Sequence, residues 1–171
     1  MARLEYFDDL LNYWHRLRAE ADGVVPSRQQ FNPMEVPKLL PFMFMVERQA
    51  PEELMIRLVG TALDGLTGSP ATGSNVLDRY GAQEREAHLA TYDNLFSLPC
   101  GAWQDRLLKV GDDPCYHTRT ILLPFADRQG APRYVIGISR VRRHHGDASE
   151  GDLHQLGTEY IDLGFGVPNG G

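Results

Sequence analysis

Residues 115–142, CYHTRTILLPFADRQGAPRYVIGISRVR, decide the fold class of this 171-residue chain. Within this stretch, 115–126 and 134–142 are rich in β-branched and aromatic side chains, and a short polar stretch with a glycine separates them, as is typical of a turn. Residues 101–110 form a similar run just before it, across another short turn. Strand-like runs joined by short turns predict an antiparallel meander.

The sequence before the meander predicts a hairpin and then helices. Residues 42–48 and 54–60 are predicted strands around a turn. Glycine, serine and threonine are frequent over 61–80, which predicts short helical turns, and 83–96 carries apolar side chains at helical spacing. The fold class expected from this order is α+β. It is a five-stranded antiparallel sheet with helices on one face and a pocket between the sheet and those helices.

The N-terminus predicts an amphipathic helix over residues 4–18. Its apolar side chains recur every three or four residues, and its charged side chains fall largely on the opposite side. Such a helix must cover an apolar surface, and two alternatives stay open: packing on its own domain, or forming an interface with a partner or a second copy in a homodimer. The candidate interface residues are Phe7, Leu10, Leu11, Trp14 and Leu17.

Composition bounds the class of protein. Lys and Arg total 17 against 23 Asp and Glu, and this net charge of −6 argues against general nucleic-acid binding, which needs a basic surface. No apolar run approaches the length of a membrane-spanning helix, and the N-terminus has no secretory signal pattern. The 2 cysteines lie outside any metal-binding spacing, so neither a disulfide framework nor a metal site is expected. We expect a cytoplasmic protein without membrane insertion.

Three segments are predicted along the chain. Residues 1–23 hold the amphipathic helix, and 24–143 form the main domain. Residues 144–171 contain five acidic residues and no Lys or Arg, and they are predicted to be an acidic, glycine-containing tail that is partly disordered. Residues 160–163 are its one candidate for a docked piece.

Several short motifs follow one another in an order that carries a family resemblance. They are Tyr13-Trp14 with Leu17-Arg18, Pro33 with Val36-Pro37, Leu39-Leu40-Pro41, Arg57-Leu58-Val59-Gly60-Thr61, Gly68 with Thr72-Gly73, and Leu122-Leu123-Pro124. Together they resemble the single-domain PAS_5 family of alphaproteobacterial PAS domains, from about Tyr6 to about Val141. The resemblance implies a PAS fold and a broad sensory or regulatory role, but it supplies no ligand.

The helix 83–96 holds the first candidate ligand-binding residues. His88 lies on its apolar side, one turn from Tyr92. The resemblance implies one alternative for His88, because haem-binding PAS proteins take an axial histidine from the corresponding helix. The other alternative, a core histidine, is favoured because a single histidine is a weak signal.

Three arginines within otherwise apolar elements complete the candidate pocket: Arg57, Arg85 and Arg119. A guanidinium group that points inward needs an anion, either an internal carboxylate or a carboxylate of a ligand. Strand alternation puts Arg119 on the more apolar face of 115–125, and that face is expected to meet the helices.

Other chemistries find little support. The sequence around Cys100 and Cys115 lacks a flavin-contacting motif, so a flavin adduct is not expected. No nucleophile with a base, metal set or kinase signature can be found, so an enzyme is not expected. The first hypothesis is therefore a stand-alone sensory or regulatory module that binds a small ligand or a partner and signals in trans. A ligand-free interaction scaffold is the second, and a small-molecule enzyme on an α+β fold is the third.

Overall fold

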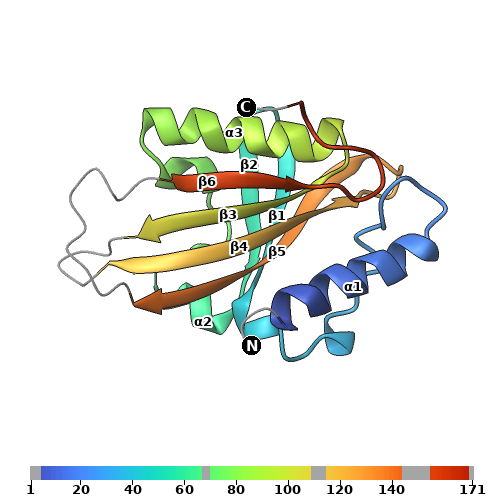
Figure 1. The fold of residues 1–171 in the computed structure, drawn as a ribbon, viewed down its shortest axis with the longest axis horizontal. Coiled ribbons are helices and arrows are strands. Elements are labelled where there is room, and N and C mark those ends of the chain that lie inside the picture. Colours follow the sequence, from blue (N-terminus) through green and yellow to red (C-terminus); the bar gives the residue numbers. More distant parts are fainter. Residues whose placement is uncertain (1–4, 67–69, 109–114, 144–154, 170–171) are drawn as a thin grey trace.

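The computed structural model describes residues 5–66, 70–108, 115–143 and 155–169. Its centre is a six-stranded antiparallel sheet in the order β2-β1-β5-β4-β3-β6 (Figure 1). The strands are β1 (Met43–Ala50), β2 (Glu53–Val59), β3 (Gly101–Leu108), β4 (Tyr116–Ala126), β5 (Pro132–Arg143) and β6 (Gln155–Ile161). The helices are α1 (Glu5–Ala19), α2 (Thr61–Asp64) and α3 (Ala82–Ser97), with the 3-10 turns η1 (Pro33–Glu35), η2 (Leu40–Phe42) and η3 (Val76–Arg79). The α+β class, the hairpin and the meander are confirmed.

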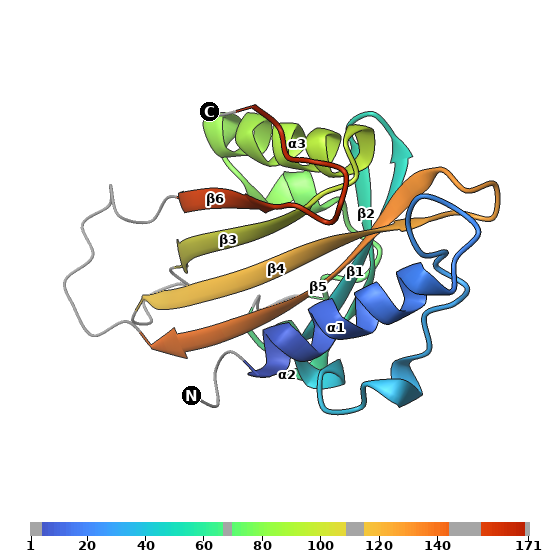
Figure 2. The same cartoon turned by 45° about the vertical axis from the view of Figure 1, so that its right-hand side comes forward.

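The sheet is covered on both faces, and each cover packs on its own apolar cluster. Figure 2 shows α1 lying across one face, which we call the α1 face. The helices α2 and α3 and the turn η3 cover the other, which we call the α3 face. Alternation along β4 divides its side chains between the two faces, with Ile121 and Leu123 in the first cluster and Leu122 in the second.

The predicted orientation of β4 is wrong. The face that carries Arg119, Ile121 and Leu123 meets α1, not the helices between β2 and β3. The physical reason is that two covers compete for the sheet. The apolar side of the amphipathic helix α1 takes the more apolar face, and the threonine-bearing face is left to line a cavity under α3.

Helix α1 packs on its own sheet, which settles the alternative left open by the sequence. Four of the five candidate interface side chains are less than 5% exposed, and the fifth, Leu11, is half-buried. The four buried ones are Phe7, Leu10, Trp14 and Leu17. These four are therefore unavailable for the predicted dimer interface in the folded chain.

Trp14 anchors this helix through a polar contact as well. Its indole Nε1 donates a hydrogen bond to the carbonyl oxygen of Pro124, at 2.8 Å. The pairing of β3 with β4 ends at Leu122, so Pro124 lies beyond the last rung on that side. Proline is tolerated in an inner strand at such a place, because no ladder hydrogen bond is required of it.

The sixth strand corrects the prediction for the C-terminal segment. Residues 155–161 pair with β3 instead of forming part of a tail, and the candidate docked piece at 160–163 is the end of this strand and its continuation. Tyr160 reaches the α3-face cluster and accepts a hydrogen bond from Asn94 Nδ2 at 2.8 Å, while Leu163 is buried in the α1-face cluster. The part of the predicted tail at 144–154 lies outside the described residues. None of the helices that the structure describes is long and apolar enough to cross a membrane.

Candidate functional site

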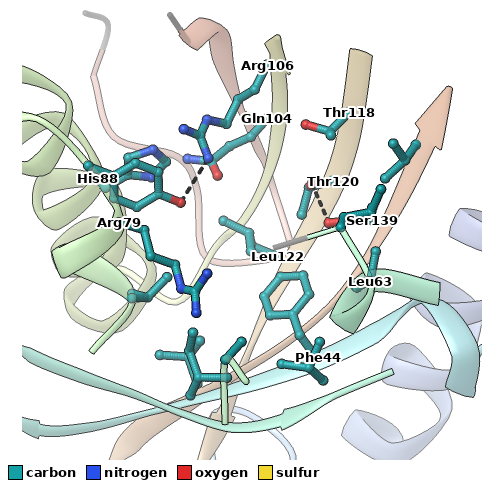
Figure 3. Close-up of a pocket in the computed structure, with 18 of the residues that line it drawn as sticks. Phe44, Leu63, Arg79, His88, Gln104, Arg106, Thr118, Thr120, Leu122 and Ser139 are labelled. Carbon is teal, nitrogen blue, oxygen red and sulfur yellow. Dashed lines mark hydrogen bonds between the residues drawn. The ribbon is translucent and has the colours of Figure 1, made fainter. Parts of the chain in front are cut away.

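A cavity of about 180 Å³ lies between the sheet and the helices of the α3 face (Figure 3). Strands β1 to β5 form one wall, and α2, η3, α3 and the adjoining loop residues form the other. Most of the lining is apolar: Phe44, Val46, Ile56, Val59, Leu63, Leu66, Ala71, Val76, Leu122 and Val141. A cavity of this size and lining suits a small apolar body, since a dry cavity of about 150 Å³ takes up benzene.

Polar side chains reach the cavity in two neighbouring rows that cross the sheet. Residues facing each other on adjacent antiparallel strands share a face, so each row is fixed by the strand register. From β3 through β4 to β5 the rows run Arg106–Thr118–Val141 and Gln104–Thr120–Ser139. The hydroxyl oxygens of Thr120 and Ser139 lie 2.7 Å apart and share a hydrogen bond. One end of the cavity is therefore polar and built on rigid strands.

The next row is apolar and forms the opposite end of the sheet wall. It runs from Ala102 through Leu122 to Gly137 and Phe44. A Cβ atom on Gly137 would lie 2.6 Å from Phe44 Cζ and would also meet the carbonyl oxygen of Ile121. Gly137 thus leaves room for the Phe44 ring, which lines the cavity.

On the helical side, three planar side chains form a stack. The rings of Tyr80 and His88 lie face to face with centroids 3.8 Å apart, and the guanidinium carbon of Arg106 lies 4.4 Å from the Tyr80 centroid. Arg106 Nη1 also donates to the Tyr80 hydroxyl at 2.9 Å. The stack fixes the orientation of the arginine fork at the polar end of the cavity (Figure 3).

His88 is neutral in this setting. It is 2% exposed, and its burial, reinforced by the positive charge of Arg106, lowers its pKa to about 3. Tyr92, one turn further along α3, is equally buried, and burial raises its pKa. Both residues therefore present uncharged groups to the cavity at neutral pH.

Three buried nitrogen atoms around the cavity have no hydrogen-bond partner in the described structure. They are Arg106 Nε, Gln104 Nε2 and His88 Nε2. A buried polar group without a partner costs about 1–3 kcal/mol. Four further unpartnered atoms lie outside the cavity lining, on Arg48, Arg119, Arg133 and Arg140. The gathering of three such atoms at one cavity makes it the candidate binding site.

The structure brings together two of the five predicted ligand-binding residues. His88 and Tyr92 line the cavity, as expected. The arginines lie elsewhere, each paired with a carboxylate: Arg57 with Glu47 at 2.7 Å, Arg85 with Asp78 at 3.3 Å, and Arg119 with Asp105 at 2.9 Å. Arg119 also stacks on Trp103, on the α1 face. The predicted pocket role of the three arginines is therefore not supported, because intramolecular carboxylates supply the anions that they need.

Sequence reasoning missed the polar residues of β3 and β4. Gln104 and Arg106 alternate along β3, and Thr118 and Thr120 alternate along β4, each pair with one residue between. Polar side chains at alternate positions indicate either a solvent-facing or a cavity-facing row. The sequence alone does not distinguish a solvent-facing row from a cavity-facing row. Because β4 was predicted in the wrong orientation, Thr118 and Thr120 were not expected to face the helices.

The residues present do not fit a haem. Sites that hold drug-sized ligands have volumes of roughly 300–1,000 Å³, and this cavity is smaller. A haem macrocycle is at least as large as a drug-sized ligand, so it needs more space than the cavity offers. The ring of His88 is also covered by Tyr80. Neither Cys100 nor Cys115 is among the described residues that line the cavity, so a thiol is not placed there for a flavin adduct.

Comparison with known proteins shows the family of the chain through a family model. No curated protein matches the chain. Among solved structures, one similar chain is that of an RNA-binding light-oxygen-voltage receptor, at 17% sequence identity and a TM-score of 0.48. That similarity covers 70% of this chain and 34% of the receptor, so the chain spans about a third of the receptor's length. A family model for the PAS domain, PAS_5, matches residues 5–140, from α1 into β5. The chain therefore belongs to the PAS domain family, as the resemblance in its sequence implied.

Proposed function

We propose that this PAS domain is a sensory or regulatory module that binds a small molecule in the α3-face cavity and passes the signal to another protein. The observation that carries the proposal is the set of unpartnered nitrogen atoms on Arg106, Gln104 and His88. All three side chains line one cavity whose remaining lining is largely apolar. A ligand with a polar end and an apolar body would satisfy both parts.

The proposed route for the signal is β4 itself. Thr118, Thr120 and Leu122 face the cavity, and the residues between them face α1. A ligand that shifts β4 would alter the packing of α1 and the surface that α1 presents to a partner. Such a shift needs a ligand with different affinities for two packings of the same elements.

An enzymatic role has less support. PAS domains are generally sensory modules, and within the described lining of the cavity there is no carboxylate or thiol. The imidazole Nε2 of His88 has no hydrogen bond to a hydroxyl group that it could activate. A ligand-free scaffold is the competing function, and it predicts that no small molecule binds the cavity.

The test is native mass spectrometry of protein purified without refolding, alongside a variant with a narrowed cavity. Val141→Phe places a larger side chain in the lining. Val24→Phe is the matched control, because Val24 is 47% exposed and lies outside the cavity. We expect a bound small-molecule mass with the wild type and with Val24→Phe, and its loss with Val141→Phe.

Two results would contradict the proposal. One is a clean apo mass together with a melting temperature that no compound in a small-molecule screen raises. The other is a bound mass that survives Val141→Phe in a folded protein, since the ligand would then lie outside the cavity. Circular dichroism of both variants confirms that the comparison is between folded proteins.

A further inference from the structure

We infer that the ligand of the α3-face cavity is a small carboxylate with an apolar body, its carboxylate held by Arg106 and Gln104. This inference rests on the proposed function and deepens it, because it names the chemistry of the ligand. It is carried by the charge, the geometry and the size of the cavity.

The charge of the cavity is positive although the chain is acidic. Two guanidinium groups, those of Arg79 and Arg106, are in the lining, and none of the lining residues that the structure describes is Asp or Glu. Neither arginine forms an ion pair with a carboxylate among the described residues. With a net charge of −6 for the whole chain, this local excess is a property of the site.

Arg106 differs from Arg119 in having no carboxylate partner among the described residues. Arg119, also on a central strand and also stacked on an aromatic ring, is paired with Asp105 at 2.9 Å, although its Nε is likewise without a partner. Within the described part of the chain, the Arg106 guanidinium contacts only the ring and the hydroxyl group of Tyr80, and its buried Nε has no acceptor. A guanidinium group needs acceptors for its N–H groups, and a carboxylate supplies two in the matching planar geometry.

Gln104 lies two residues before Arg106, on the same face of β3 (Figure 3). It is 5% exposed, and its amide nitrogen is without a partner. A carboxylate oxygen at this end of the cavity would accept from both side chains, with the hydroxyl groups of Thr118 and Thr120 nearby in the same two rows. His88 is held neutral, and Arg79, the second guanidinium group of the lining, comes from η3 on the helical wall. On β3 itself, the fork of Arg106 beside the neutral amide of Gln104 suits a single carboxylate.

The apolar part of the lining determines the size and polarity of the rest of the ligand. Phe44, Leu122 and the aliphatic side chains of β1, β2 and α2 leave room for a body of about the size of a benzene ring. A purely polar anion would leave this apolar surface against solvent, whereas an aromatic or short aliphatic body would cover it.

The experiment is calorimetric titration with three carboxylates and their matched amides: benzoate, phenylacetate and hexanoate against benzamide, phenylacetamide and hexanamide. Each pair has the same body and differs in charge. We expect the best carboxylate to bind at least about tenfold more tightly than its amide, which corresponds to one charge-assisted hydrogen bond.

Arg106→Gln and Arg119→Gln form the variant pair. Arg106→Gln should weaken the carboxylate about 10- to 100-fold and leave the amide within about threefold. Arg119→Gln removes an equivalent arginine from the other face of the sheet and should change neither affinity by more than about twofold. Arg106→Lys, which keeps the charge but loses the fork, should give an intermediate affinity and serves if Arg106→Gln is poorly folded.

The outcomes separate the two proposals. Equal affinities for carboxylates and amides, both abolished by Val141→Phe, would overturn the inference and leave the cavity as a ligand site. If no carboxylate binds and native mass spectrometry finds an uncharged compound bound instead, the inference is overturned and the cavity remains a ligand site. Failure of every probe together with a clean apo mass would overturn both.

Discussion

At the scale of single residues, the shape of the cavity depends on the contact between Gly137 and Phe44. Gly137 faces Phe44 across the β1–β5 pair and Leu122 across the β4–β5 pair. The absence of a side chain at this point lets the Phe44 ring cover the strand and close the apolar end of the cavity. A residue with no functional group thus controls the volume available to a ligand.

Gly137→Ala tests this contact. The added methyl group meets both the Phe44 ring and the backbone of Ile121, and only the ring can move. We expect a loss of about 1–3 kcal/mol in the free energy of unfolding, from overpacking, and weaker binding of benzoate as the ring moves into the cavity. Urea denaturation and calorimetry measure the two effects. Gly157→Ala on β6, where a Cβ meets nothing within 4 Å, is the control and should stay within about 0.5 kcal/mol of the wild type. A wild-type stability for Gly137→Ala would contradict this account of the cavity.

His88 gives the fold a specific dependence on pH. Its pKa is about 3 in the folded protein against 6.5 for the unperturbed group, because burial and then Arg106 disfavour the imidazolium. Between these values the unfolded chain binds a proton that the folded chain does not, so stability falls as the pH falls from 6.5 towards 3. The slope is at most about 1.4 kcal/mol per pH unit.

His88→Gln removes this dependence. From pH 7 to pH 5 the wild type should lose about 2 kcal/mol of unfolding free energy through His88, and the variant should not lose it. Urea denaturation of both proteins at several pH values measures this difference. Thr118→Val, which alters the same cavity without a titrating group, should follow the wild-type curve. Parallel curves for His88→Gln and the wild type would contradict this, because they would show that the pKa of His88 is the same in the folded and unfolded protein.

At the scale of elements, most of the fold follows from local sequence patterns. The five predicted strands and the two longer helices lie within two residues of the observed bounds, because alternation, helical spacing and turn residues act over a few neighbours. The orientation of β4 and the destination of α1 depend on contacts such as that of Trp14 with Pro124, 110 residues apart. No pattern within either segment contains that information.

The same argument applies to the candidate site. Helical spacing places His88 and Tyr92 on the inner side of α3, and both line the cavity. Arg106 and Arg119 are each an arginine within a strand, and their roles differ only through partners across the sheet and from η3. The sequence did not predict β6, because this segment contains acidic residues and a glycine, which strands usually lack. Its partner β3 also lies about fifty residues earlier in the chain.

The strand β6 joins the two covers of the sheet. Tyr160 contacts α3, and Leu163 and Phe165 pack with the α1-face cluster, where Arg18 lies over the Phe165 ring at 5.5 Å. It also protects β3 from becoming an edge strand, and exposed edges promote pairing with other chains.

Removal of residues 155–171 should therefore both destabilise the protein and promote self-association. We expect a loss of at least about 2 kcal/mol, the order of one fully buried apolar side chain, measured by urea denaturation, and oligomers in sedimentation velocity. Tyr160→Phe removes only the acceptor for Asn94 and should cost about 1 kcal/mol without association. A monomeric truncated chain of unchanged stability would show that β6 contributes nothing to the fold.

At the scale of the whole molecule, one sheet serves two different surfaces. Its α1 face carries the larger apolar cluster, whereas its α3 face keeps a cavity with the Arg106 guanidinium, whose Nε has no partner, at one end. The two are connected through alternate side chains of β4 and through the segment that follows β6. This arrangement suits a module in which ligand binding in the cavity alters the packing of α1 on the other side of the sheet.

The central claim is that the α3-face cavity is the ligand site, and chemical-shift mapping tests it most directly. Benzoate is added to the ¹⁵N-labelled chain, and the amide signals are followed to saturation. The account predicts that the largest shifts occur at 104–106, 118–120 and 137–141, with a second group around His88 and Tyr92, and that they disappear in Val141→Phe. Saturable shifts confined to other surfaces, such as the surroundings of Arg57 and Glu47, or no saturable shift with any of the carboxylates and amides together with a clean apo mass, would contradict it.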